Sequence, residues 1–193
     1  MKGSVTVVTY EKTAEDAKKK LAEGNERYVA SRAASLDASE VVLNESVHGQ
    51  KPYAVIIACS DSRVIPEAIF SAGIGDLFVI RVAGNVIDTH QLGSIEYAAE
   101  HLGTRLVVVL GHDHCGAIDA ALHHQNTGYV KHITDIILKA VGDEKNEMKA
   151  CCLNVANSCK AIENSLHIQN NDENGLTVVG AVYHLESGRV EFL

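Results

Sequence analysis

The chain has 193 residues, of which 46% are hydrophobic and 22% are charged. This size and composition predict one compact domain with a substantial apolar core, and they exclude the class of disordered tail proteins. The 17 basic and 25 acidic residues give a net charge of -8, and no cluster of Lys and Arg is dense enough to follow a phosphate backbone, so we expect no nucleic-acid partner.

Membrane insertion and secretion are not expected either. No stretch approaches the roughly 18 to 20 continuous apolar residues of a membrane span, and the amino end lacks the charged-then-apolar layout of a secretory signal. The chain has five cysteines, two of them adjacent, which suits reduced thiols or metal ligands better than a disulfide scaffold. We therefore expect a cytoplasmic protein.

The first predicted element is a helix from Thr13 to about Arg32. Thr13 can cap its first turn, and Asp16 follows three positions later as in a capping box. We expect a single domain over residues 1–193, with an N-terminal helical arm over residues 1–50 and an α/β core over residues 51–193.

Short apolar runs in the core predict buried strands, and longer stretches with apolar residues every three or four positions predict helices. The predicted strands are 53–58, 77–82, 106–110 and 176–185, followed by 189–193 after a turn. Ala83-Gly84-Asn85 is predicted to be a turn, and the core helices are predicted at 89–103 and from 143 to about 169.

Buried strands that alternate with helices predict an α/β fold. We expect a central, mostly parallel β-sheet of about four parallel strands plus a C-terminal antiparallel edge strand, flanked by helices. Functional sites in such sheets form beyond the carboxyl ends of the strands. Residues 59–63 and 111–116 both follow predicted strands, so we expect them to meet at this edge.

Three residues in these segments have the chemistry of a zinc site. Cys59 ends the first strand, while His112 and Cys115 stand three apart after the third. Zinc binds thiolate sulfur and imidazole nitrogen, and catalytic sites use three protein ligands with the fourth position left for water or substrate. The alternatives are buried structural residues or a closed structural zinc site, and Asp61 with Arg63 could be an ordinary loop ion pair.

The surrounding sequence resembles a known family. The segment Cys59-Ser60-Asp61-Ser62-Arg63-Val64, together with Gly111-His112-x-x-Cys115-Gly116, is similar to the signature of the β-class carbonic anhydrases, and the similarity extends from about residue 50 to residue 117. The resemblance implies one Zn²⁺ per subunit, bound by Cys59, His112 and Cys115 in a zinc-binding core.

The same resemblance assigns further site residues. Asp61 and Arg63 match the family's catalytic dyad beside the metal. Gln50, Phe78 and Tyr97 match residues of its substrate pocket and dimer seam, and Gly116 lies where the chain passes the metal or begins a helix. A homodimer or an assembly of dimers is therefore implied, and an N-terminal helix with no obvious place on a small sheet favours exchange of elements between subunits.

The implied reaction is the reversible hydration of carbon dioxide to bicarbonate and a proton by zinc-bound hydroxide. Asp61 would accept a hydrogen bond from the hydroxide, and Arg63 would hold the carboxylate away from the metal. Val82 stands where the family often has asparagine. The chain has no tryptophan, so the side pocket that binds bicarbonate in one bacterial subset is incomplete, and we expect water on zinc at neutral pH.

Two other functions remain open at this point. The same scaffold could hydrolyse carbonyl sulfide or carbon disulfide, or the chain could be a non-catalytic zinc-binding or redox protein. Packing is the preferred explanation for Cys151, Cys152 and Cys159, because Cys152 and Cys159 fall on the apolar stripe of the predicted helix. The best interpretation of His114, His123 and His124 is solvated side chains.

Overall fold

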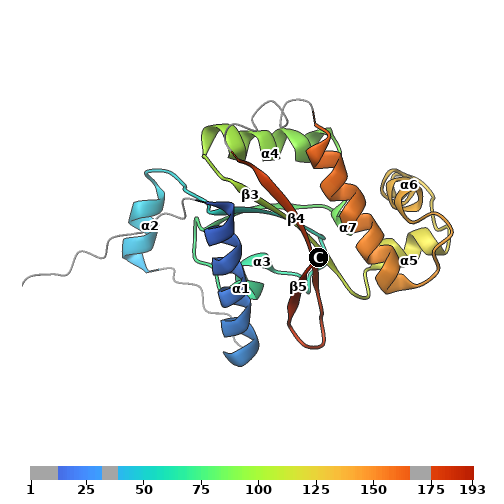
Figure 1. Ribbon diagram of the computed structural model, residues 1–193, viewed down its shortest axis with the longest axis horizontal. Helices are drawn as coiled ribbons and strands as arrows, with labels where there is room; N and C mark the ends of the chain where they lie inside the picture. The colour runs from blue at the N-terminus through green and yellow to red at the C-terminus, as the bar shows by residue number, and fades with distance from the viewer. Residues whose placement is uncertain (1–12, 32–38, 166–174) are drawn as a thin grey trace, which may run out of the picture.

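The computed structural model describes residues 13–31, 39–165 and 175–193. Its centre is a five-stranded sheet in the order β2-β1-β3-β4-β5 (Figure 1). β1 pairs in parallel with β2 and β3, β3 pairs in parallel with β4, and β4 pairs antiparallel with β5. The strands are β1 Ala54–Ala58, β2 Leu77–Arg81, β3 Leu106–His112, β4 Thr177–Tyr183 and β5 Val190–Phe192. The predicted α/β sheet is confirmed.

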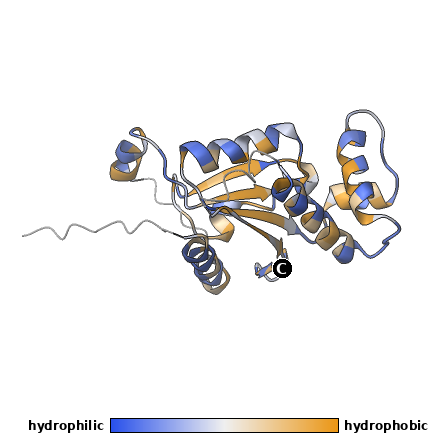
Figure 2. Cartoon of the chain, turned by 45° about the horizontal axis from the view of Figure 1, so that its top comes forward, coloured by the Kyte–Doolittle hydropathy of each residue, from blue (hydrophilic) through white to orange (hydrophobic). Residues whose placement is uncertain are grey.

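Helices cover both faces of this sheet. The helices are α1 Ala14–Ser31, α2 Glu40–Ser46, α3 Pro66–Ile69, α4 Thr89–His101, α5 Gly116–Leu122, α6 Val130–Val141 and α7 Glu147–Glu163. One face packs against α1 and α3, and the other against α4 and α7. β1 and β3 are buried along their whole length, which explains why residues 54–58 and 106–110 read as unbroken apolar runs. Figure 2 shows the hydrophobic colour gathered on the central strands.

The N-terminal helix packs on the sheet of its own chain, so the expectation that it has no place there is wrong. Leu21 is fully buried, in a cluster that includes Ile56 and Phe70. A side chain at Gly24 would clash with the carbonyl oxygen of Phe70, so glycine allows this close approach. The predicted cap is confirmed, because the backbone N–H of Asp16 donates to Thr13 Oγ1 at 3.1 Å.

Other boundaries differ from the prediction. The last long helix begins at Glu147, later than the predicted residue 143, and runs to Glu163. The predicted helix ends near residues 32 and 169 lie outside the described residues. The division of the chain at residues 50 and 51 stays a prediction. Among residues 13–31, 39–165 and 175–193, no helix combines the length and apolar character needed to cross a membrane.

Candidate metal centre

The sheet brings Cys59, His112 and Cys115 together. Ala58 on β1 pairs with Leu110 on β3, so Cys59, which follows β1, and His112, the last residue of β3, lie at the same edge. One ligand atom from each of the three residues lies within 4.8 Å of the other two, and all three residues are buried. The two sulfur atoms are 4.0 Å apart. The predicted convergence of these three residues is therefore confirmed.

The ring of His112 is oriented as a metal ligand needs to be. Nδ1 lies 2.7 Å from the carbonyl oxygen of Asp113, so an Nδ1–H can donate there. Nε2 is buried and has no hydrogen-bond partner. A buried ring nitrogen without a partner is costly unless something occupies the space before it. Zinc fits this requirement, because zinc-binding histidines commonly donate their second ring N–H to a carbonyl or carboxylate.

Cys59 is prepared to carry negative charge. The pKa of Cys59 is lowered, first because the Cys115 thiol bonds to it, then because of the neighbouring His112 ring, and also because backbone N–H groups of Gly84 and Asp61 point at its sulfur. These amide nitrogens lie 3.2 Å and 3.4 Å from Sγ. The same bond with Cys59, together with burial, raises the pKa of Cys115. A metal ion binding here would replace the thiol proton that remains on the pair.

Gly84 delivers one of these amides from the turn after β2. Its φ is +69°, and a side chain here would meet Ile137 Cδ1 at 2.9 Å and Ala117 Cβ at 3.0 Å. Its carbonyl accepts a hydrogen bond of 2.7 Å from the buried side chain of Asn154. The turn predicted at 83–85 is present as a 3₁₀ turn, and its contact with Cys59 was missed.

Asp61 and Arg63 form a forked ion pair beside the cluster. Arg63 donates through Nε to Oδ1 at 2.9 Å and through Nη2 to Oδ2 at 2.7 Å. The backbone N–H of Arg63 adds a bond of 2.9 Å to Oδ1. These bonds hold the pKa of Asp61 well below its usual range. The carboxylate is thus ionised, and both of its oxygens are engaged by Arg63.

Arg81 is a positioning residue that the sequence interpretation missed. It donates to the carbonyl oxygens of Cys59 at 3.1 Å and Asp61 at 2.6 Å, and so fixes the loop that carries both. The available signal was a single charge within the apolar stretch Leu77–Val82, at the last position of β2. A guanidinium there is beside the end of β1, because Arg81 pairs with Ala58.

The expected pocket residues do not join the cluster within one chain. Phe78 pairs with Val55, three positions before Arg81, which places it about 10 Å along the strand from the metal edge. Its ring lies 6.2 Å from that of Tyr97, which is 48% exposed. Gln50 is exposed just before β1, whereas Gly116 begins α5 directly after Cys115.

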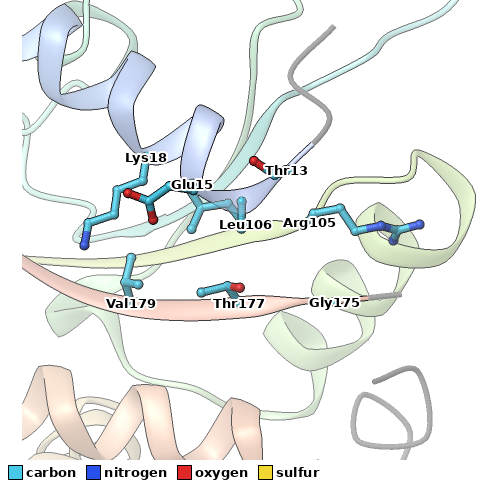
Figure 3. Close-up of a pocket in the computed structure, with 9 residues that line it drawn as sticks. Thr13, Glu15, Lys18, Arg105, Leu106, Gly175, Thr177 and Val179 are labelled. Carbon is cyan, nitrogen blue, oxygen red and sulfur yellow. The ribbon is translucent and has the colours of Figure 1, made fainter. Parts of the chain in front are cut away.

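A cavity of about 480 Å³ lies elsewhere, between the first turn of α1 and the beginnings of β3 and β4 (Figure 3). Its lining includes Lys18, Arg105 and Thr177. This is the opposite end of the strands from the Cys-His-Cys cluster, and none of the expected site residues lines it.

Known proteins share this architecture and sequence. A family model described as carbonic anhydrase matches residues 54–190. Carbonic anhydrase 2 of Mycobacterium tuberculosis is 49% identical over 128 residues, which cover 64% of this chain and 62% of that relative. The carbonic anhydrase of Mycolicibacterium smegmatis is 38% identical over 187 residues and 90% of each chain.

Solved structures agree. One of two tetrameric β-carbonic anhydrases from Sordaria macrospora aligns with a TM-score of 0.73 at 28% identity, covering 89% of this chain and 93% of that one. The β-carbonic anhydrase CcaA aligns with a TM-score of 0.71 at 27% identity, covering 91% and 98%. The sheet, the buried cluster and these relatives lead to one conclusion: the chain belongs to the β-class carbonic anhydrase family.

Proposed function

We propose that this chain is a zinc lyase that catalyses the reversible hydration of carbon dioxide to bicarbonate and a proton. One Zn²⁺ per subunit would be held by Cys59, His112 and Cys115. The observation that carries the proposal is the buried cluster of these three ligand atoms within 4.8 Å, in a member of this family. Three protein ligands leave a fourth position for water, which is the arrangement of a catalytic zinc site.

The chemistry divides between the metal and the loop beside it. Zinc, when bound, lowers the pKa of water toward ~7 and so supplies a nucleophile at neutral pH. Asp61 stays ionised under its bonds from Arg63, so it can accept a hydrogen bond from the attacking water and direct it toward the carbon. Addition of water to carbon dioxide gives bicarbonate, and the released proton passes to buffer.

Arg63 has a second proposed role, which is to keep the fourth position open. Because its guanidinium engages both oxygens of Asp61, that carboxylate is turned away from acting as a fourth ligand. The chain has no tryptophan to complete the bicarbonate side pocket of one bacterial subset. We therefore propose the open arrangement at neutral pH.

The substrate pocket is proposed to form at a dimer seam, where Gln50, Phe78 and Tyr97 of one subunit face the cluster of the other. Supporting this, Tyr97 is exposed, and Phe78, whose ring lies 6.2 Å from that of Tyr97, is about 10 Å along β2 from the metal edge of its own chain. The related Sordaria macrospora proteins are tetrameric, which suits an assembly of dimers. A cytoplasmic location is proposed from the five cysteines, all of which are free.

Stopped-flow hydration with a pH indicator tests the function. Zinc-replete protein is expected to hydrate carbon dioxide, and Cys59→Ser is expected to lose both zinc and activity. Cys159→Ser is the matched control, since Cys159 is a half-buried cysteine on α7 outside the cluster and is expected to keep both.

Either of two results would contradict this proposal and support a different function. Faster release of sulfide from carbonyl sulfide or carbon disulfide than hydration of carbon dioxide would identify a hydrolase of the sulfur analogues. A full complement of zinc without hydration activity would identify a non-catalytic zinc-binding or redox protein.

A further inference from the structure

The ring of His112 takes its orientation from the residue that follows it. Its Nδ1 lies 2.7 Å from the carbonyl oxygen of Asp113, and this contact leaves Nε2 for the cluster. The direction of Nε2 therefore depends on how firmly the Asp113 carbonyl is held. On the other side, the His112 carbonyl accepts a bond from the buried Cys151 thiol at 3.4 Å, which fixes the backbone against α7.

Asp113 is bound to the segment that leaves β4. Its backbone N–H donates to the carbonyl of Tyr183 at 3.2 Å. Its carboxylate accepts a bond of 2.9 Å from the backbone N–H of Leu185 and lies 3.5 Å from His184 Nδ1. The side chain is 17% exposed. Every polar group of Asp113 thus contacts either His112 or residues 183–185.

A nearby aspartate shows what an ordinary surface pair looks like. Asp119 lies on α5, four residues beyond Cys115, and its carboxylate is 3.1 Å from His123. That side chain is 61% exposed, and its partner belongs to the same helix. Asp113 differs because its carboxylate joins two segments far apart in the chain, with one of the candidate zinc ligands next to it.

We propose that Asp113 is a positioning residue for the zinc site. Its carboxylate ties the turn after β4 to the carbonyl that orients His112. The inference rests on the proposed zinc site and adds a residue that acts through His112. Loss of the carboxylate would free Leu185, loosen the Asp113 carbonyl and let the imidazole turn away from the metal. Removal of a group that hydrogen-bonds to a zinc-binding histidine commonly lowers the affinity for the metal.

The test measures metal binding directly. Competition with a chromophoric chelator gives the zinc dissociation constant, and the absorption spectrum of cobalt-substituted protein reports the ligand geometry. Asp113→Ala is expected to bind zinc about 10- to 100-fold more weakly, with an altered cobalt spectrum. Asp113→Asn keeps an oxygen that can accept from Leu185, so it is expected to rescue most of the affinity. Asp119→Ala is the matched control and is expected to behave as the wild type.

Wild-type affinity and an unchanged cobalt spectrum in Asp113→Ala would overturn the proposal. Should this variant fail to fold, amide hydrogen exchange in the wild-type protein decides the matter. Zinc loading is expected to slow exchange at Leu185 and leave Arg189, at the far end of the same turn, unchanged. Equal exchange at Leu185 with and without zinc would overturn the proposal.

The outcome is separable from that of the proposed function. Wild-type protein that binds zinc but hydrates no carbon dioxide would remove the proposed activity and leave the role of Asp113 intact. Wild-type protein that binds no zinc would overturn both.

Discussion

Two backbone amides, from Asp61 and Gly84, point at the sulfur of Cys59 in a buried site. Amide dipoles aimed at a sulfur favour the thiolate, which is the form that binds metal. The amide of Gly84 reaches Cys59 because the turn has a positive φ and lies close against α5 and α6, with Ala117 and Ile137 next to it. The backbone conformation of Gly84 thus favours the negatively charged form of Cys59, a candidate zinc ligand.

A side chain at Gly84 is expected to disturb both the packing and the metal site. Gly84→Ala combines the backbone cost of a positive φ, about 1–2 kcal/mol, with overpacking against Ile137 of about 1–3 kcal/mol. Gly103→Ala is the matched control, since Gly103 has φ +72° and nothing within 4 Å of an added Cβ. Urea unfolding of the two variants measures the difference, and equal losses of stability would show that the close approach has no energetic effect.

Removal of the guanidinium is expected to impair catalysis while leaving the three candidate ligands in place. In Arg63→Ala, Asp61 loses both side-chain bonds and is free to turn toward the metal or toward solvent. We expect carbon dioxide hydration to fall about 10- to 100-fold with zinc content retained. Stopped-flow rates and metal analysis on the same sample measure this, and an unchanged rate would contradict the proposed role of Arg63.

The same pair makes a prediction about acid stability. The folded-state pKa of Asp61 lies below its unfolded value of about 3.9, so the pair contributes stability above about pH 4 and loses it as the pH falls further. Zinc-free wild type is expected to melt at a higher temperature than zinc-free Arg63→Ala at pH 7. The gap is expected to shrink toward pH 3, and a gap that stays constant over this range would argue against the linkage.

At the scale of elements, Asn25 joins α1 to two other parts of the fold. Its amide Nδ2 donates to the carbonyls of Ile69 at 3.1 Å and Gly188 at 2.8 Å. Its Oδ1 accepts from the backbone N–H of Val190 at 2.9 Å. The side chain is buried, and its three bonds satisfy two backbone carbonyls and one backbone N–H.

Asn25→Ala is therefore expected to destabilise the protein by about 1–3 kcal/mol, because it leaves buried backbone groups without partners. Urea unfolding monitored by circular dichroism measures the change. Lys19→Ala, at an exposed site on the same helix, controls for helix effects and is expected to be close to neutral. If Asn25→Ala lowered the free energy of unfolding no more than Lys19→Ala does, water would be replacing the hydrogen bonds of the Asn25 amide at no cost.

The sequence predicted elements well where the sheet buries them and poorly where helices pack on helices. β1 and β3 were recognisable because both faces are covered, which requires unbroken apolar runs. α6 was missed, although Ile133, Ile137 and Val141 recur at steps of four along it, and α5 was predicted only as one of two options at Gly116. Part of their apolar surface packs in a separate cluster around the cysteines, away from the faces of the sheet that guided the prediction.

The buried face of α7 also differs from the face that the apolar stripe predicted. The predicted stripe placed Cys152 and Cys159 inward, yet both are only half-buried and Cys151 is the buried cysteine. The reason is polar: Asn154 and Ser158 are buried because they donate to the carbonyls of the turn at 83–85. Hydrophobic periodicity does not register such bonds, so the stripe pointed slightly away from the true inner face.

At the scale of the whole molecule, bound zinc would link the ends of β1 and β3 to the start of α5. Removal of the metal with a chelator is expected to lower the melting temperature, and added zinc is expected to restore it. The stabilisation is about 2.7 kcal/mol when free zinc is 100 times the dissociation constant. Differential scanning calorimetry measures this. Cys59→Ser is expected not to respond to zinc, and an equal response would place the stabilising metal elsewhere.

The convergence of the cluster was predictable because parallel strands deliver their ends to a common edge, as Cys59 and His112 illustrate. Arg81 and Gly84 were not recognised, since their contributions are a long-range bond to a carbonyl and a backbone N–H. Phe78 and Tyr97 lie together but away from the cluster of their own chain. The proposed pocket across two subunits would leave no register signal in one sequence.

Cys59 and Cys115 are separated by 56 positions, and the segments that carry them are brought together by the long-range pairing of β1 with β3. As the chain is synthesised, the first thiol leaves the ribosome well before the imidazole and the second thiol exist. A nascent chain therefore offers zinc a single soft donor, too few to retain it. Binding of the proposed zinc by all three ligands would have to follow pairing of β1 with β3, so bound zinc would report that the core has folded.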